Sequence, residues 1–149
     1  MSIVTIDQTP ISYEKFRSKL PNDPDKMERE VEMGATYYEE ICFETARKGQ
    51  EFQYAKINHD ITYAEVLLRV ARDAANDKLK VDEKKAIVDT DSEVIEAKMT
   101  LKDAETTYDQ WYGLKKSWEA KLDLLDAQTR LILSGMIGYT KVQTGQKRK

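Results

Sequence analysis

Apolar residues recur at alternating steps of three and four through residues 94–136, and this repeat constrains the fold more than any other feature. Eleven of the thirteen positions are apolar. An isolated helix of 3.6 residues per turn would drift from a strict 3.5-residue repeat by roughly 20° per heptad. The repeat therefore predicts one long coiled-coil helix over about 92–137, on the order of 65 Å long, with Gly135 and Gly138 at its end. Its positions are Val94, Ala97, Leu101, Ala104, Tyr108, Trp111, Lys115, Trp118, Leu122, Leu125, Thr129, Ile132 and Met136.

The composition favours helices throughout the chain. The 149 residues are 40% hydrophobic and 34% charged, with only six glycines and three prolines. Many helix formers and few turn formers exclude a β-sandwich and most α/β enzymes. We therefore expect an all-α protein of one domain.

A further helix is expected over about 25–79, with a break or kink near Gly49, where basic residues precede a glycine. The link over residues 80–92 offers Asp82 and then Asp91 or Ser92 as N-caps, so the chain turns back into an antiparallel helical hairpin. Two apolar seams are expected in the first helix, the second with coiled-coil spacing. The first seam is Met27, Val31, Ala35, Tyr38, Cys42 and Ala46, and the second is Ile57, Ile61, Ala64, Leu68, Ala71 and Ala75.

Three regions follow from these patterns. Residues 1–24 form an N-terminal arm with a short helix, in which Ile11, Phe16 and Leu20 share a face. Residues 25–140 form the hairpin. Residues 141–149, KVQTGQKRK, form a flexible basic tail without an acidic residue.

The long repeat needs a cover that a chain of this length does not supply along its whole length, unless the first helix runs continuously through Gly49. We therefore expect other copies of the protein to cover it. Fully burying a large apolar side chain contributes about 1.5–3 kcal/mol, so tryptophans repeated around an oligomer would dominate its assembly. The alternative is that both tryptophans fill a core within one chain. The expected oligomer interface is Tyr108, Trp111, Trp118, Leu122 and Leu125.

The sequence carries no catalytic signature. His59 is the only histidine, so the HD dipeptide at 59–60 lacks the further ligands that a metal phosphohydrolase needs. Cys42 is the only cysteine and makes no internal disulfide, which favours the cytoplasm. No nucleotide-binding or hydrolase motif occurs, and no apolar run is long enough to cross a bilayer. We expect no enzyme activity, cofactor, metal or membrane association.

Basic residues gather around the expected hairpin turn. Arg69 and Arg72 flank the second seam, and Lys78 and Lys80 follow in the link, with Lys84 and Lys85 beyond them. In a ring of hairpins these cations would recur along a common edge, which is an arrangement that binds phosphates. Glu65 and Asp73 lie beside the arginines, however, and charges alternating in this way are also typical of a solvated helix.

The order of these features resembles small helical proteins of tailed bacteriophages and, in its latter part, recombination mediator proteins of the UvsY type. The resemblance is carried by "ISYEKFRSKLPNDPDKMEREVEMGATYYEE", the link "KVDEKKAIVDTDSEVIEAK" and the long helix "LKDAETTYDQWYGLKKSWEAKLDLLDAQTRLILSGMIGY". It implies a ring-like oligomer that binds single-stranded DNA and helps to load a RecA-like recombinase in place of a single-strand-binding protein. The stretch "LLRVARDAAND" lies where such mediators contact DNA, but it lacks the tyrosines and glycines expected after the arginines.

The resemblance assigns nucleic-acid binding to Arg69 and Arg72, and position and charge add Lys78 and Lys80. The expected function is that of a recombination mediator acting on single-stranded DNA, with a recombinase and a single-strand-binding protein as partners. Two rival functions are a structural or scaffolding role in phage assembly, and a small adaptor or inhibitor that binds a host protein.

Overall fold

A computed structural model describes Tyr13 and residues 27–145 of the chain. Its helices are α2 (Met27–Arg72), the short 3-10 helix η2 (Ala74–Asn76), α3 (Val81–Asp89) and α4 (Ser92–Gly145). The described residues contain no strand. The predicted all-α hairpin is therefore confirmed, whereas the predicted N-terminal arm lies outside the described residues.

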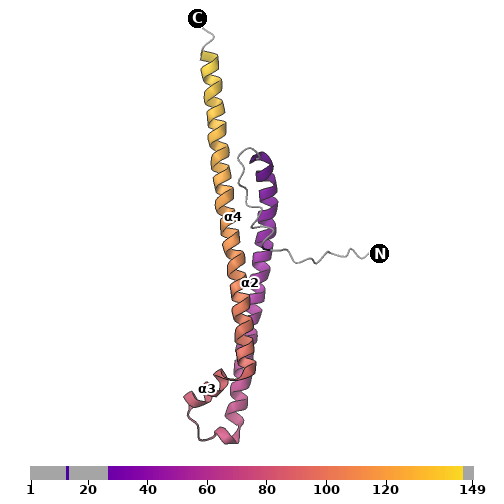
Figure 1. Cartoon of the computed structure of the whole chain (residues 1–149), viewed down its shortest axis with the longest axis vertical. Helices are drawn as coiled ribbons and strands as arrows, with labels where there is room; N and C mark the ends of the chain where they lie inside the picture. The colour runs from indigo at the N-terminus through magenta and orange to yellow at the C-terminus, as the bar shows by residue number, and fades with distance from the viewer. Residues whose placement is uncertain (1–12, 14–26, 146–149) are drawn as a thin grey trace, which may run out of the picture. The chain divides into compact units, whose positions relative to one another are not determined.

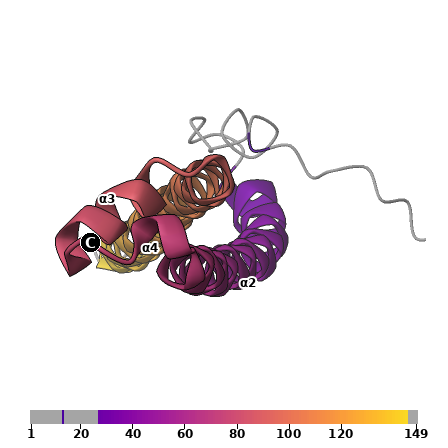
Figure 2. The same cartoon turned by 90° about the horizontal axis from the view of Figure 1, so that it is seen from below.

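The chain divides into two compact units, one formed by residues 1–41 and 114–149 and the other by residues 42–113. In the second unit, the later part of α2 and the beginning of α4 lie antiparallel, and α3 lies beside their connection (Figures 1 and 2). Thr45 contacts Trp111 there, and Arg69 contacts Glu93, so residues further along α2 meet earlier residues of α4. The first unit has the same antiparallel pairing, because Tyr38 binds Glu119.

Local hydrogen bonds explain how the chain turns between α2 and α4. α2 ends at Arg72 because Asp73 takes an extended conformation, and the Asp73 carboxylate accepts a hydrogen bond from Ala75 N at 3.0 Å. Glu83 Oε2 accepts from Lys80 N at 2.7 Å at the start of α3. Asp91 caps α4 by accepting from Glu93 N at 2.9 Å, as one of the two predicted caps. α3 begins at Val81, so Asp82 lies inside it and is not its cap.

Four valines form the core next to this turn. Val66 and Val70 come from α2, Val88 from α3 and Val94 from α4, and all four are buried. Tyr63 and Leu67 of α2 pack against the cluster. Burying apolar area contributes about 25 cal/mol per Å², so this cluster holds α3 against the two long helices.

In the first unit, the core lies between the beginning of α2 and the middle of α4. Ile41, Leu114, Trp118 and Leu125 are buried. The Tyr37 ring packs edge-on against Trp118, with ring centroids 5.8 Å apart. Gly34 leaves room for this packing, because a Cβ there would lie 3.1 Å from Leu122 Cδ2.

The predicted seam of α4 is buried or half-buried at every position whose side chain is described. The side chains of Ile132 and Met136 lie outside the described set. α4 does not end near residue 137, because it passes Gly135 and Gly138 and continues to Gly145. Residues 141–145 of the predicted flexible tail are therefore helical, and residues 146–149 lie outside the described residues. A helical glycine costs only about 1 kcal/mol relative to alanine. Gly135 and Gly138 are therefore tolerated within this 54-residue helix.

Three predictions for α2 were wrong. The helix does not break at Gly49, and it ends at Arg72 instead of near 79. The second predicted seam is exposed at all six positions, although its spacing is that of a coiled coil. Of the first seam, Tyr38 and Cys42 are half-buried, Ala35 and Ala46 are exposed, and the side chains of Met27 and Val31 lie outside the described set.

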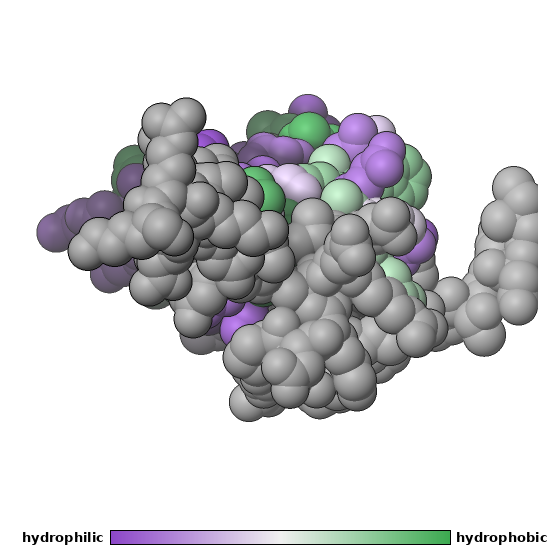
Figure 3. Space-filling model, turned by 90° about the horizontal axis from the view of Figure 1, so that it is seen from above, coloured by the Kyte–Doolittle hydropathy of each residue, from purple (hydrophilic) through white to green (hydrophobic). Residues whose placement is uncertain are grey.

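The physical reason is that α2 carries apolar residues on two opposite faces and α4 covers only one of them. Residues two positions apart on a helix point about 200° apart. Val66 and Val70 therefore face the valine cluster, while Leu68 between them faces outward. Where the described atoms are visible in Figure 3, apolar residues lie at the surface among hydrophilic ones. No helix among the described residues has the length and apolar character that crossing a membrane requires.

Candidate nucleic-acid interface

The four predicted DNA-binding residues all lie in the unit formed by residues 42–113, around the turn between α2 and α4. Arg69 and Arg72 occupy the last turn of α2. Lys78 lies in the connection after η2, and Lys80 directly precedes α3. These positions place all four residues at one end of the hairpin. All four are exposed.

Arg69 already has an acidic partner. Its guanidinium donates two hydrogen bonds to the Glu93 carboxylate, at 3.1 and 3.0 Å. These hydrogen bonds and the charge of Glu93 raise the pKa of Arg69 above its usual value. Both side chains are more than half exposed, so the pair is screened by solvent and contributes little to stability. A phosphate would have to compete with Glu93 for this arginine.

Arg72, Lys78 and Lys80 differ from Arg69 in this respect. None of them forms an ion pair with any residue that the structure describes. Glu65, Leu68, Arg69, Arg72 and Asp73 line an open depression on the surface of α2. Arg72 is therefore the arginine that is more available to a phosphate.

Acidic residues alternate with these cations. Residues 65–93 hold six Lys/Arg and eight Asp/Glu, so this end of the hairpin is not a continuous cationic patch. Four of the acids have local partners: Asp73, Glu83 and Asp91 accept hydrogen bonds from backbone amides at helix starts, and Glu93 binds Arg69. Their oxygens are directed to these partners, although their negative charge remains.

This arrangement suits contacts to phosphates more than contacts to bases. Residues 64–107 contain no aromatic side chain, so the hairpin end lacks the rings on which single-stranded bases stack. Lysine and arginine contacts to phosphates position a strand without reading its sequence. No cluster of three potential metal ligands occurs in the part of the chain that the structure describes.

The five residues predicted for an oligomer interface lie on α4 and face α2 of the same chain. Trp118 is 1% exposed and Trp111 is 5% exposed, so the alternative of a core within one chain describes both tryptophans. Leu125 is also buried, and Tyr108 and Leu122 are half-buried. Only their small exposed edges are open to a second copy, and their role in an oligomer stays a prediction.

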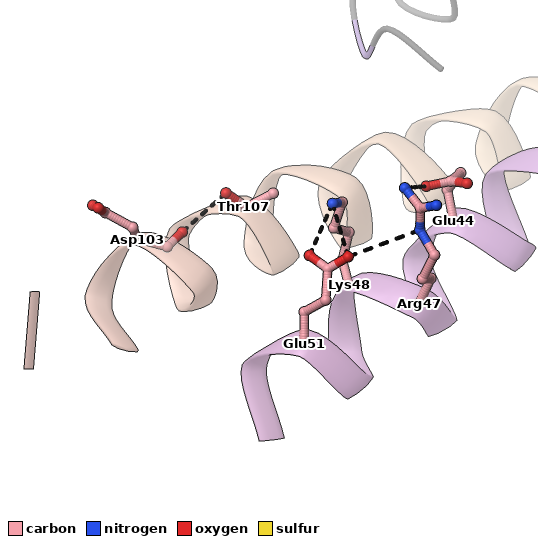
Figure 4. Close-up of polar contacts among 6 residues, drawn as sticks. All are labelled: Glu44, Arg47, Lys48, Glu51, Asp103 and Thr107. Carbon is pink, nitrogen blue, oxygen red and sulfur yellow. Dashed lines mark hydrogen bonds and ion pairs between the residues drawn. The ribbon is translucent and has the colours of Figure 1, made fainter. Parts of the chain in front are cut away.

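A charged cluster within α2 was not predicted as a special feature. Glu44 is buried and pairs with Arg47 at 3.1 Å (Figure 4). Lys48 donates hydrogen bonds of 3.2 and 2.9 Å to Glu51, and Arg47 approaches Glu51 at 3.9 Å. The spacing of three and four residues is visible in the sequence, but the burial of Glu44 is not. Beside this cluster, Thr45 Oγ1 donates a hydrogen bond to Trp111 O of α4 at 3.4 Å.

Sequence reasoning also missed an apolar groove on α4. It is lined by Ile95, Lys98, Met99, Leu101, Lys102 and Glu105. Ile95 and Met99 lie outside the seam that the apolar repeat marks, so the repeat gave no signal for them.

Comparisons with known proteins show a likeness in fold alone. No protein family matches the chain, and no curated protein matches it. The crystal structure of the recombination mediator protein UvsY of bacteriophage T4 is similar, with a TM-score of 0.67 and 12% sequence identity. The similarity covers 82% of this chain and 94% of UvsY, so it includes most of both chains.

Proposed function

We propose that the protein is a recombination mediator that binds single-stranded DNA and helps to load a RecA-like recombinase. The observation that carries this proposal is the likeness to the fold of the T4 recombination mediator protein over 94% of that protein's chain. The resemblance of the sequence to UvsY-type mediators supports the same function. A single-strand-binding protein and the recombinase are the proposed protein partners.

The mechanism has no chemical step. Arg72, Lys78 and Lys80 hold the phosphates of the strand at the hairpin end, where these cations have no acidic partner among the described residues. Arg69 joins them when a phosphate displaces Glu93. Repetition of this end in an oligomer adds weak sites through avidity and lowers the cost of exchanging one coating protein for another.

Substitution of the free cations tests the site. We expect the combined variant Arg72→Ala, Lys78→Ala and Lys80→Ala to bind a fluorescent dT oligonucleotide at least about tenfold more weakly than wild type, measured by anisotropy at low salt. The matched control is Arg130→Ala, because Arg130 is also an exposed arginine but lies on α4, in the other unit, where it pairs with Asp126 at 2.8 Å. It should bind as wild type does.

Equal affinity of the triple variant and the control for the oligonucleotide would show that the hairpin end is not the DNA-binding site. A wild-type protein that folds and associates but ignores the oligonucleotide would instead favour the structural or scaffolding function.

A further inference from the structure

One face of α2 has the spacing of a coiled coil but no partner among the residues that the structure describes. We call Tyr54, Ile57, Ile61, Ala64 and Leu68 the α2 stripe; they alternate at steps of three and four. Every member is exposed, and Ile57, Ile61 and Leu68 are each more than half exposed. Large apolar side chains at heptad spacing pack against another helix in a coiled coil. Because α4 covers the opposite face of α2, no helix among the described residues covers this stripe.

The groove on α4, defined above by its six lining residues, is the second unpaired apolar surface of the same unit. Met99 is 64% exposed there and Ile95 is 45% exposed. Lys98 and Lys102 give the groove a basic side. The α2 stripe has Asp60 beside it, which is exposed and acidic.

The stripe and the groove lie at the same level of the hairpin. Arg69 contacts Glu93 across the antiparallel pair, and both helices rise about 1.5 Å per residue. Leu68 is therefore level with Val94 and Ile95, and Asp60 is level with Lys102.

We propose that the α2 stripe of one copy packs against the α4 groove of a second copy lying beside it in the same orientation. Leu68 then meets Ile95, and Asp60 meets Lys102, whose charge is opposite. Lys56, which is exposed on α2, comes level with Glu105 of the second copy. Lys102 and Glu105 now bind each other at 2.9 Å, but this pair is exposed, and exposed pairs cost little to exchange.

This contact joins two different surfaces, so every copy offers both a stripe and a groove. Such a contact repeats from copy to copy and closes into a ring when its rotation allows. Copies in the same orientation also place their hairpin ends along one edge. The inference goes beyond the proposed function, because the contact forms whether or not the edge binds DNA.

The test is self-association without nucleic acid, measured by sedimentation. Ile61→Asp in the stripe and Met99→Asp in the groove should each weaken self-association at least about tenfold. The matched control is Leu124→Asp, because Leu124 is half exposed on α4 but belongs to neither surface. It should associate as wild type does, and circular dichroism should show the same helix content in all variants.

Charge exchange is the second test, at two exposed positions where substitution does not disturb the core. Asp60→Lys and Lys102→Asp should each weaken association, and the two together should restore most of it. A monomeric wild type would overturn the proposal. A loss of association in Ile61→Asp but not in Met99→Asp would also overturn it, because the stripe would then pair with itself. Single charge variants that associate as wild type does would overturn it as well.

Discussion

The Tyr108 ring packs over Gly49, and its Cε2 atom lies 3.2 Å from where a Cβ on that glycine would stand. The ring is also stacked on Phe52, with ring centroids 6.0 Å apart. Tyr108 therefore has little room to move away from a side chain at position 49. The glycine permits this approach of α4 to α2, which explains its place in the middle of a continuous helix.

Replacing two helical glycines should separate helix propensity from packing. Gly113 is helical, with nothing within 4 Å of an added Cβ, so Gly113→Ala should raise the free energy of unfolding by about 1 kcal/mol. Gly49→Ala gains the same propensity but must displace Tyr108, so we expect no stabilisation. Urea unfolding followed by circular dichroism compares the two, and equal stabilisation would show that Tyr108 moves freely.

Trp118 should be the most costly side chain to remove from the first unit. It is 1% exposed and contacts Tyr37, so Trp118→Ala should lower the free energy of unfolding by about 3–5 kcal/mol. Its Nε1 is buried without a hydrogen-bond partner among the residues that the structure describes. Trp118→Phe removes that unpaired donor along with part of the ring, so it should cost clearly less. Equal losses in the two variants would contradict this account of the site.

The pH dependence of stability should include a contribution from Glu119. Hydrogen bonds from Lys116 and Tyr38 lower the pKa of Glu119 below its usual value near 4.5. Because the folded pKa is the lower one, this contribution is complete above the unfolded value and is lost as the pH falls through the folded pKa.

Thermal unfolding between about pH 6 and about pH 3 measures this contribution. The melting temperature of wild type should fall more steeply over this range than that of Glu119→Gln, which has no carboxylate to protonate. Tyr38→Phe removes one of the two hydrogen bonds and should lie between them. Identical profiles for wild type and Glu119→Gln would show that the hydrogen bonds do not form in solution.

Glu93 should limit DNA binding by holding Arg69. Glu93→Gln removes one negative charge from the hairpin end and frees Arg69 from its acidic partner. We expect this variant to bind a dT oligonucleotide several-fold more tightly than wild type at low salt, with little change in stability because the ion pair is exposed. Weaker binding would mean that the Arg69–Glu93 pair itself shapes the site. Glu96→Gln, which removes an exposed charge one turn further along α4, is the control.

The sequence predicted the helix class and the buried face of α4 because its apolar repeat marks a single face. The same reasoning failed on α2, where Ile57, Ile61 and Leu68 repeat as regularly as core residues but lie outside. Periodicity reports that a helix has an apolar face; it does not report which of two such faces the chain itself covers. Polar members of the true contact face, such as Glu44 and Thr45, carry no apolar signal at all.

For a related reason, some helix ends were predicted correctly and others were not. Asp91 was identified as a cap because a side-chain carboxylate next to the helix start acts locally. Gly49 predicted a break or kink and Gly138 a helix end, but the small local cost of each glycine is outweighed in long helices. The four cations of the candidate site were found from charge and resemblance, whereas the pairing of Arg69 with Glu93 depends on a contact between residues 24 positions apart.

The most direct test of the central claim is the salt dependence of binding between the wild-type protein and a single-stranded dT oligonucleotide. If Arg72, Lys78 and Lys80 contact phosphates, the logarithm of the binding constant should fall linearly with the logarithm of the salt concentration, with a slope of about −2 or steeper. No binding at low salt, or binding that salt does not weaken, would contradict a phosphate-contacting mediator.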